Sequence, residues 1–136
     1  MTAEDNKRLL GEAFDGLARA DATAFLDLMA DDFSWIIEGQ SAWSIRFDGK
    51  AAVQRDLIPP LFANFATPYR TAAEEIIAEG DRVVVLARGE VKTKAGEDYN
   101  NSYCFVIRMR GGKMIELREY MDTALAEARL SLDRPE

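Results

Sequence analysis

The stretch Tyr99-Asn-Asn-Ser-Tyr-Cys-Phe-Val-Ile-Arg-Met-Arg-Gly-Gly-Lys-Met-Ile-Glu-Leu-Arg-Glu-Tyr-Met-Asp-Thr-Ala-Leu125 decides the fold of this chain. It predicts two antiparallel strands joined by a tight turn at Gly111-Gly112, and a helix that starts at Asp122. Side chains alternate along a strand, so one face of the second strand carries Ile115, Leu117, Glu119 and Met121. Three apolar neighbours indicate that this face points inward. Glu119 is therefore expected to be either a structural ion-pair partner or the working group of a pocket.

Composition excludes several classes of function. The chain has 136 residues, enough for one domain with a core, and its net charge of -7 argues against nucleic acid and anionic membranes as partners. It contains no run of 18 apolar residues, and the polar N-terminus does not resemble a signal peptide, so a cytoplasmic location is expected. The single cysteine, Cys104, excludes an internal disulfide.

The chain has no histidine. This removes Ser-His-Asp and Cys-His nucleophile systems, histidine-ligated zinc and the usual proton shuttle at neutral pH. No spacing of Asp and Glu resembles a calcium loop, so neither a metal nor another cofactor is expected. Any acid–base chemistry must use carboxylates, tyrosines, lysines or Cys104.

The rest of the chain predicts helices first and strands afterwards. Thr2-Ala-Glu-Asp5 resembles a capping box that starts a helix to about residue 20, and Asp21 can cap a second short helix. Further expected elements are strands at 33–38 and 43–47, a helix at 50–58 that Pro59-Pro60 must interrupt, and strands at 70–78, 82–92, 99–109 and 114–121. This order is typical of an α+β fold, and residues 1–136 are expected to form a single domain.

The strand at 82–92 is apolar on both faces. One face carries Val83, Val85, Ala87, Gly89 and Val91, and the other carries Val84, Leu86, Arg88 and Glu90. An antiparallel sheet in a monomer usually exposes one face to water. We therefore expect helices to cover one side of the sheet and a second subunit to cover the other, in a homodimer.

Several segments resemble the SnoaL-like branch of the nuclear-transport-factor-2-like superfamily, which includes ketosteroid isomerases, polyketide cyclases and limonene epoxide hydrolases. The matching segments are Leu28-Met-Ala-Asp-Asp-Phe-Ser-Trp35, Phe47-Asp-Gly-Lys-Ala-Ala-Val53, Gly80-Asp-Arg-Val-Val-Val85, Lys94-Ala-Gly-Glu-Asp-Tyr-Asn-Asn-Ser-Tyr103 and Gly112-Lys-Met-Ile-Glu-Leu-Arg-Glu-Tyr-Met-Asp122. The resemblance implies a cone-shaped, curved antiparallel or mixed sheet wrapped around N-terminal helices, a cystatin-like α+β barrel. It also implies a mostly apolar pocket for a small molecule between the helices and the concave face.

The resemblance suggests a catalytic group. Asn100, Ser102, Cys104 and Val106 are the expected inward set on the strand before Glu119, and Arg88 and Glu90 are expected to converge with Glu119. Limonene epoxide hydrolases have an Asp–Arg–Asp arrangement in matching places, so Glu119, Arg88 and Glu90 are the candidate catalytic residues. The structural alternative is a buried Arg–Glu pair. Trp35-Ile-Ile37 stands where those enzymes have water-positioning Tyr and Asn, which counts against epoxide hydrolysis.

The steroid isomerase arrangement fits less well. Its base would fall on Ile37 or Glu38, its helical Tyr on Ala13 or Phe14, and its acid on Cys104, so steroid isomerisation is not expected. The expected ligand-binding residues are Trp35, Ile37, Trp43, Leu86, Asn100, Cys104 and Leu117. The sequence thus predicts binding of a small apolar molecule, with carboxylate acid–base chemistry of hydrolase, cyclase or isomerase type. The alternative is a non-catalytic ligand-binding or dimerisation module.

Overall fold

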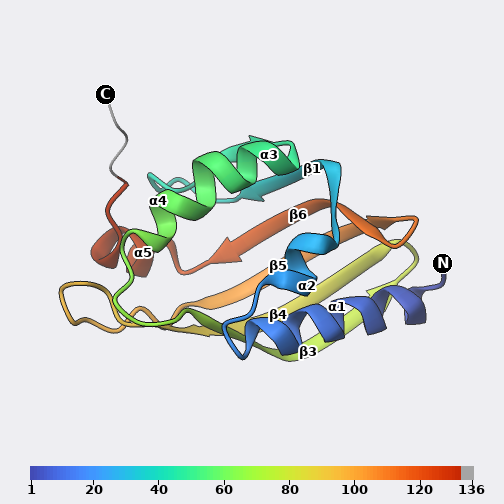
Figure 1. Cartoon of the computed structure of the whole chain (residues 1–136), viewed down its shortest axis with the longest axis horizontal. Helices are drawn as coiled ribbons and strands as arrows, with labels where there is room; N and C mark the ends of the chain where they lie inside the picture. Colours follow the sequence, from blue (N-terminus) through green and yellow to red (C-terminus); the bar gives the residue numbers. More distant parts are fainter. Residues whose placement is uncertain (133–136) are drawn as a thin grey trace.

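The computed structural model describes residues 1–132 and shows helices packed on one strongly curved six-stranded sheet (Figure 1). The strands are β1 (Met29–Ile37), β2 (Arg46–Asp48), β3 (Arg70–Glu79), β4 (Arg82–Glu90), β5 (Ser102–Arg110) and β6 (Lys113–Met121). They lie in the order β2-β1-β6-β5-β4-β3, in which only β1 and β6 are parallel. The expected α+β class with a curved mixed sheet is confirmed.

The helices are α1 (Ala3–Leu17), α2 (Thr23–Asp27), α3 (Lys50–Ala52), η1 (Val53–Leu57), α4 (Ile58–Phe62) and α5 (Thr123–Arg129). Figure 1 shows α1 lying along β3 and β4, while α3 and α4 lie beside β1 at the other side of the curved sheet. Within residues 1–132, no helix is both long enough and apolar enough to cross a lipid bilayer.

The first helix begins with the predicted capping box. The Thr2 hydroxyl accepts from the Asp5 backbone N–H at 3.1 Å, and the Asp5 carboxylate accepts from the Thr2 N–H at 3.0 Å. The helix ends at Leu17, earlier than predicted. Its buried stripe includes Leu10 and Phe14 and faces the sheet, so α1 closes one side of the core.

The prediction that Pro59-Pro60 interrupts the helix is wrong, because the chain stays helical from Lys50 to Phe62. The π-helical turn η1 precedes the prolines, and the Ile58 N–H donates to the Val53 carbonyl, five residues back. The two prolines then occupy the first turn of α4, where a missing backbone N–H costs little. In this continuous helical segment α3 packs on β1 and η1 packs on β2.

The register between strands places Glu119 at the centre of the concave face. Gly111 and Gly112 both adopt positive φ, 57° and 81°, as the predicted turn requires. Glu119 lies opposite Phe105 on β5 and beside Ile37 on β1. It is buried, at 7% exposed, as its apolar strand neighbours predicted.

The predicted faces of β4 and β5 are wrong. On β4 the inward residues are Val83, Val85, Ala87 and Gly89, and on β5 they are Tyr103, Phe105, Ile107 and Met109. The set expected inward on β5, namely Asn100, Ser102, Cys104 and Val106, belongs to the outer side. Both faces of these strands are rich in apolar residues, so alternation alone could not identify the buried one.

Candidate functional site

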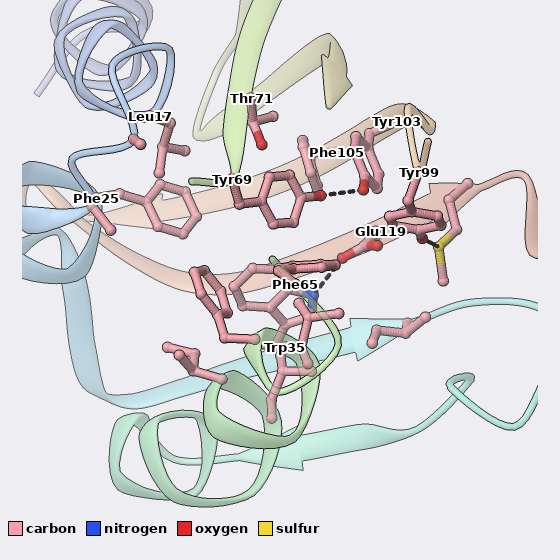
Figure 2. Close-up of a pocket in the computed structure, with 18 of the residues that line it drawn as sticks. Leu17, Phe25, Trp35, Phe65, Tyr69, Thr71, Tyr99, Tyr103, Phe105 and Glu119 are labelled. Atoms are coloured by element: carbon pink, nitrogen blue, oxygen red, sulfur yellow. Dashed lines mark hydrogen bonds between the residues drawn. The ribbon is translucent and has the colours of Figure 1, made fainter. Parts of the chain in front are cut away.

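A cavity of about 400 Å³ lies between the concave face of the sheet and the helices. Most of its lining is apolar, and aromatic side chains are prominent (Figure 2). The aromatic residues are Phe14, Phe25, Trp35, Trp43, Phe62, Phe65, Tyr69, Tyr99, Tyr103 and Phe105. A concave, largely apolar space with a few polar groups is the usual form of a small-molecule site.

Glu119 supplies the one carboxyl group among the described residues that line the cavity. The Trp35 indole Nε1 donates a hydrogen bond of 2.9 Å to its Oε1. Burial raises the pKa of Glu119 to about 7, and the Trp35 hydrogen bond opposes part of that rise because it favours the charged form. No lysine or arginine stands in the described lining, so Glu119 is not half of a buried ion pair there.

Three tyrosines at the same end of the cavity were missed by the sequence analysis. The hydroxyl groups of Tyr69 and Tyr103 are hydrogen-bonded to each other, and Tyr99 lies on the same side of Glu119 (Figure 2). Desolvation raises the pKa of Tyr99 to about 12 and also raises the pKa values of Tyr69 and Tyr103. All three phenols are therefore neutral hydrogen-bonding groups at physiological pH.

Gly89 on β4 makes room for the tyrosine pair. A Cβ at this position would lie 3.0 Å from Cε2 of Tyr103 and 3.1 Å from Cε1 of Tyr69. These separations are tighter than ordinary carbon–carbon contacts, so a larger residue would displace the rings. The glycine that the sequence places between Arg88 and Glu90 thus supports the polar end of the cavity.

Asn101 holds Tyr99 in place through a hydrogen bond to its hydroxyl group. It is fully buried, and its Nδ2 donates to the Tyr99 hydroxyl at 3.0 Å and to the Asp122 carbonyl at 3.1 Å. Its Oδ1 accepts from the backbone N–H groups of Ser102, at 2.8 Å, and Asp122, at 3.0 Å. Both polar atoms of the Asn101 amide therefore have hydrogen-bond partners, and these bonds tie the start of β5 to the end of β6.

The expected convergence of Arg88, Glu90 and Glu119 is wrong. Arg88 and Glu90 lie on the exposed face of β4, and Arg88 Nε is 3.9 Å from Glu74 Oε1 at the surface. Val85, Ala87 and Gly89 take the inward positions instead. Neither Arg88 nor Glu90 is placed to act with Glu119.

Glu38, the other carboxylate considered as a base, pairs with Arg118, whose Nη1 is 2.9 Å from Glu38 Oε1. It is not among the residues that line the cavity. Its side chain is partly exposed, at 30%, at the end of β1.

The seven expected ligand-binding residues divide into two groups. Trp35, Ile37 and Trp43 line the cavity. Leu86, Asn100 and Cys104 lie on the outer side of the sheet, and Leu117 is buried in the core without reaching the cavity. Their roles toward a ligand stay predictions, but only the first group is placed to contact one.

A family model for the SnoaL-like domain matches residues 10–117. Bal32a, from a soil-derived mobile gene cassette, is 18% identical with a TM-score of 0.81, covering 95% of this chain and 98% of that chain. A Jannaschia sp. CCS1 protein provisionally named a SnoaL-like polyketide cyclase is 19% identical, with a TM-score of 0.78 and coverages of 97% and 95%. TerC, co-crystallized with polyporic acid, is 24% identical, with a TM-score of 0.75 and coverages of 92% and 97%. No curated protein matches the chain. At these identities the structural likeness shows a shared fold.

Proposed function

The chain belongs to the SnoaL-like domain family, and from that premise we propose that it binds a small, largely apolar organic molecule in its cavity and exchanges a proton with it through Glu119. The observation that carries this proposal is the position of Glu119. It is a lone carboxyl group on the wall of an aromatic cavity, with a pKa raised to about 7 by burial. A buried acid with a perturbed pKa in a concave site is a typical candidate for proton transfer.

The raised pKa suits Glu119 to either direction of proton transfer. Near neutral pH both its acid and its carboxylate forms are populated, so it can donate or accept without a large free-energy penalty. The neutral phenols of Tyr69, Tyr99 and Tyr103 are available to donate hydrogen bonds to charge that develops on a substrate. Hydrolysis, cyclisation and isomerisation each include steps of this kind.

A mechanism with two carboxylates bridged by arginine has no support here, because Arg88 and Glu90 lie on the opposite face of the sheet. The proposal therefore assigns proton transfer to Glu119 alone, with Trp35 holding one of its oxygens in place. Limited support for an organic ligand comes from TerC, a structural neighbour co-crystallized with polyporic acid.

The experiment is a comparison of wild type with Glu119→Gln after incubation with a metabolite extract. We expect both proteins to retain a small molecule that mass spectrometry detects, and only wild type to convert it to product. Glu74→Gln, which removes an exposed carboxylate on β3, is the matched control and is expected to behave as wild type. Turnover that survives Glu119→Gln, or an empty cavity in both proteins, would contradict the proposal.

Ligand binding without turnover is the second candidate function. It is favoured by the scarcity of chemical groups: apart from Glu119, the described lining holds no acid or base that titrates near neutral pH. In that case the wild type would return its bound compound unchanged, and Glu119→Gln would alter affinity only.

We further propose that the chain forms a homodimer through the outer face of its sheet. We also propose that the protein is cytoplasmic. Neighbouring strands place Ile77 beside Val84 and Val84 beside Val106, and Leu86 lies beside Cys104. Ile77 and Leu86 are 52% and 37% exposed. An apolar patch of this kind on a sheet face favours contact with a second subunit.

A further inference from the structure

The segment that follows α5 forms part of the cavity wall. Residues 130–132, which we call the strap, begin in an extended conformation, since Leu130 has a φ of -109° and a ψ of 138°. Successive side chains of an extended chain point to opposite sides. Accordingly, Leu130 and Leu132 are partly buried and pack against the main core, whereas Ser131 between them is exposed. Leu130 also lines the cavity, so the strap closes a part of its wall.

The side chain of Asn64 holds the strap against the end of α4. Its Oδ1 accepts a hydrogen bond from the Ser131 backbone N–H at 2.8 Å, and its Nδ2 donates to the Ser131 carbonyl at 3.0 Å. The same Nδ2 is 3.1 Å from the Pro60 carbonyl and 3.3 Å from the Leu61 carbonyl, so it also satisfies the last turn of α4. One amide therefore joins two segments that line the cavity, α4 through Leu61 and the strap through Leu130.

The helix before the strap is held mainly by contacts at the surface. Figure 1 shows α5 at one end of the molecule, and α5 packs only lightly on the other helices and strands. Ala126 is its one fully buried residue. The Glu127 carboxylate accepts from the Ala42 backbone N–H, and Arg129 is 3.1 Å from Glu97, both in exposed positions. Exposed ion pairs contribute little stability, and segments with few buried apolar contacts open most readily.

The strap covers the end of the cavity at which Glu119 lies. Leu130 packs against a small apolar cluster that includes Phe65 and Tyr99, and both of these residues line the cavity. Their rings are stacked, with centroids 6.2 Å apart, and Tyr99 lies at the Glu119 end (Figure 2). Withdrawal of Leu130 would therefore open the cavity close to the one carboxyl group of its described lining.

We propose that the strap is a gate for the cavity and that the Asn64 amide is its latch. While both hydrogen bonds to Ser131 are formed, Leu130 completes the wall; when they break, Leu130 leaves the wall and a small apolar molecule can pass. Both bonds lie at exposed positions, where water can replace the protein partners, so the gate opens without disruption of the sheet or of α1. This inference rests on the proposed binding function and adds the route by which the ligand enters and leaves.

Two variants break the latch from opposite sides. Asn64→Ala removes the amide, and with it the bonds to the end of α4. Ser131→Pro removes the backbone N–H that donates to Asn64, while Asn64 keeps its bonds to α4. A proline is compatible with this position because Leu130, the residue before it, is already extended. Gln54→Ala, an exposed change on η1, is the matched control.

The exchange rate of a fluorescent probe measures the gate. N-phenyl-1-naphthylamine is a neutral aromatic compound that emits more strongly in apolar surroundings, and stopped-flow mixing and dilution give its association and dissociation rates. We expect both rates to rise about tenfold in each latch variant, as the loss of one or two neutral hydrogen bonds would give. Kd should stay unchanged, because a gate alters both rates equally. Gln54→Ala should match wild type.

Hydrogen exchange followed by mass spectrometry tests the opening without a ligand. Peptides that cover residues 123–132 should exchange about tenfold faster in the latch variants than in wild type, for the same loss of hydrogen bonds, whereas peptides from α1 should not change. Exchange in the wild-type strap as slow as in the central strands would overturn the gate.

The outcomes separate the gate from the proposed function. Probe rates unchanged in either latch variant that folds, or a dissociation rate that rises alone so that Kd weakens, would overturn the gate and leave the binding function standing. A probe that does not bind wild type at all would overturn both. Equal acceleration of both rates, together with faster exchange at the strap, would support both.

Discussion

Glu119 ionises more readily in the unfolded chain than in the folded protein. Its pKa is raised from 4.5 to about 7 by burial, so between these pH values the folded state holds a proton that the unfolded state has released. Stability from this group is fully present below pH 4.5 and is lost as the pH rises toward 7. The loss amounts to about 3 kcal/mol in the free energy of unfolding, at 1.36 kcal/mol per pKa unit.

Glu119→Gln should remove this pH dependence. A glutamine cannot ionise, so we expect the variant to equal wild type near pH 4 and to exceed its stability by about 3 kcal/mol at pH 8. Urea unfolding of both proteins across this range is the measurement. Exposed acids such as Asp5 and Asp21, whose pKa values are lowered by hydrogen bonds, contribute equally to both curves. If the free energies of unfolding of the two proteins instead changed in parallel with pH, Glu119 would already be ionised in the folded state.

Trp35 tunes the acidity of Glu119 through its indole N–H. The hydrogen bond of 2.9 Å favours the carboxylate, so Trp35→Phe should raise the pKa of Glu119 above 7. Infrared or ¹³C-NMR titration of the carboxyl group measures this shift. Trp43→Phe is the matched control, because Trp43 also lines the cavity but its Nε1 has no described hydrogen-bond partner. An equal shift in both variants would assign the effect to altered burial.

At the scale of the strands, Gly89 leaves little room for added volume, because a Cβ there would lie 3.0 Å from the Tyr103 ring. Gly89→Ala would press a methyl group against Tyr69 and Tyr103, so we expect a loss of about 1–3 kcal/mol in stability and weaker binding of a small aromatic probe in the cavity. Gly11→Ala, in the open interior of α1, should instead stabilise the protein by about 0.5–1 kcal/mol. Chemical unfolding measures both. A neutral effect at Gly89 would show that the tyrosine pair can move without cost.

An irregularity in the β5–β6 hairpin explains why the sequence analysis chose the wrong inward residues. Beside the turn Arg110 lies opposite Lys113, and an unbroken register from there would place Cys104 opposite Glu119. The register shifts by one residue between Arg108 and Met109, so Phe105 takes that place. A one-residue shift reverses the face of every following residue. The strands could thus be predicted, but the bulge left no signal that could have identified Tyr103.

The helical wall of the cavity shows a second limit to predicting structure from the sequence. A proline pair predicts an end to a helix, and that rule rests on the interior of an α-helix. Here the π-turn η1 changes the spacing so that Pro59 and Pro60 fall in a first turn. Leu57, Ile58 and Leu61 then line the cavity from a segment predicted to break at 58. Such a compensation depends on tertiary packing, in which α3 contacts β1 and η1 contacts β2, and is not visible in local sequence.

For the whole molecule, the order of elements predicted the α+β class, and the resemblance to the SnoaL-like family supplied the curved sheet around the N-terminal helices. Glu119 was also predicted as an inward carboxyl group, because three apolar residues share its face. Trp35 was predicted to bind the ligand, but its hydrogen bond to Glu119 was not, and the tyrosines that line the same cavity come from segments far apart in the chain: Tyr69, Tyr99 and Tyr103. The cavity is a product of tertiary packing, and so is the raised pKa of Glu119.

The outer face of the sheet yields the last prediction, which concerns the proposed homodimer. Leu86 borders an apolar row formed by Ile77, Val84 and Val106, and specific interfaces bury roughly 1,200–2,000 Å² in total. Leu86→Glu would place a second carboxylate beside Glu75, its neighbour on β3, in that interface, so native mass spectrometry and light scattering should show a monomer, whereas wild type should be a dimer. Leu86 does not line the cavity, so the variant should still bind a small aromatic probe there. Lys7→Glu, an exposed change on α1, should leave the dimer intact. A wild-type chain that stays monomeric at high concentration would contradict the proposal and leave the apolar outer face to a different partner.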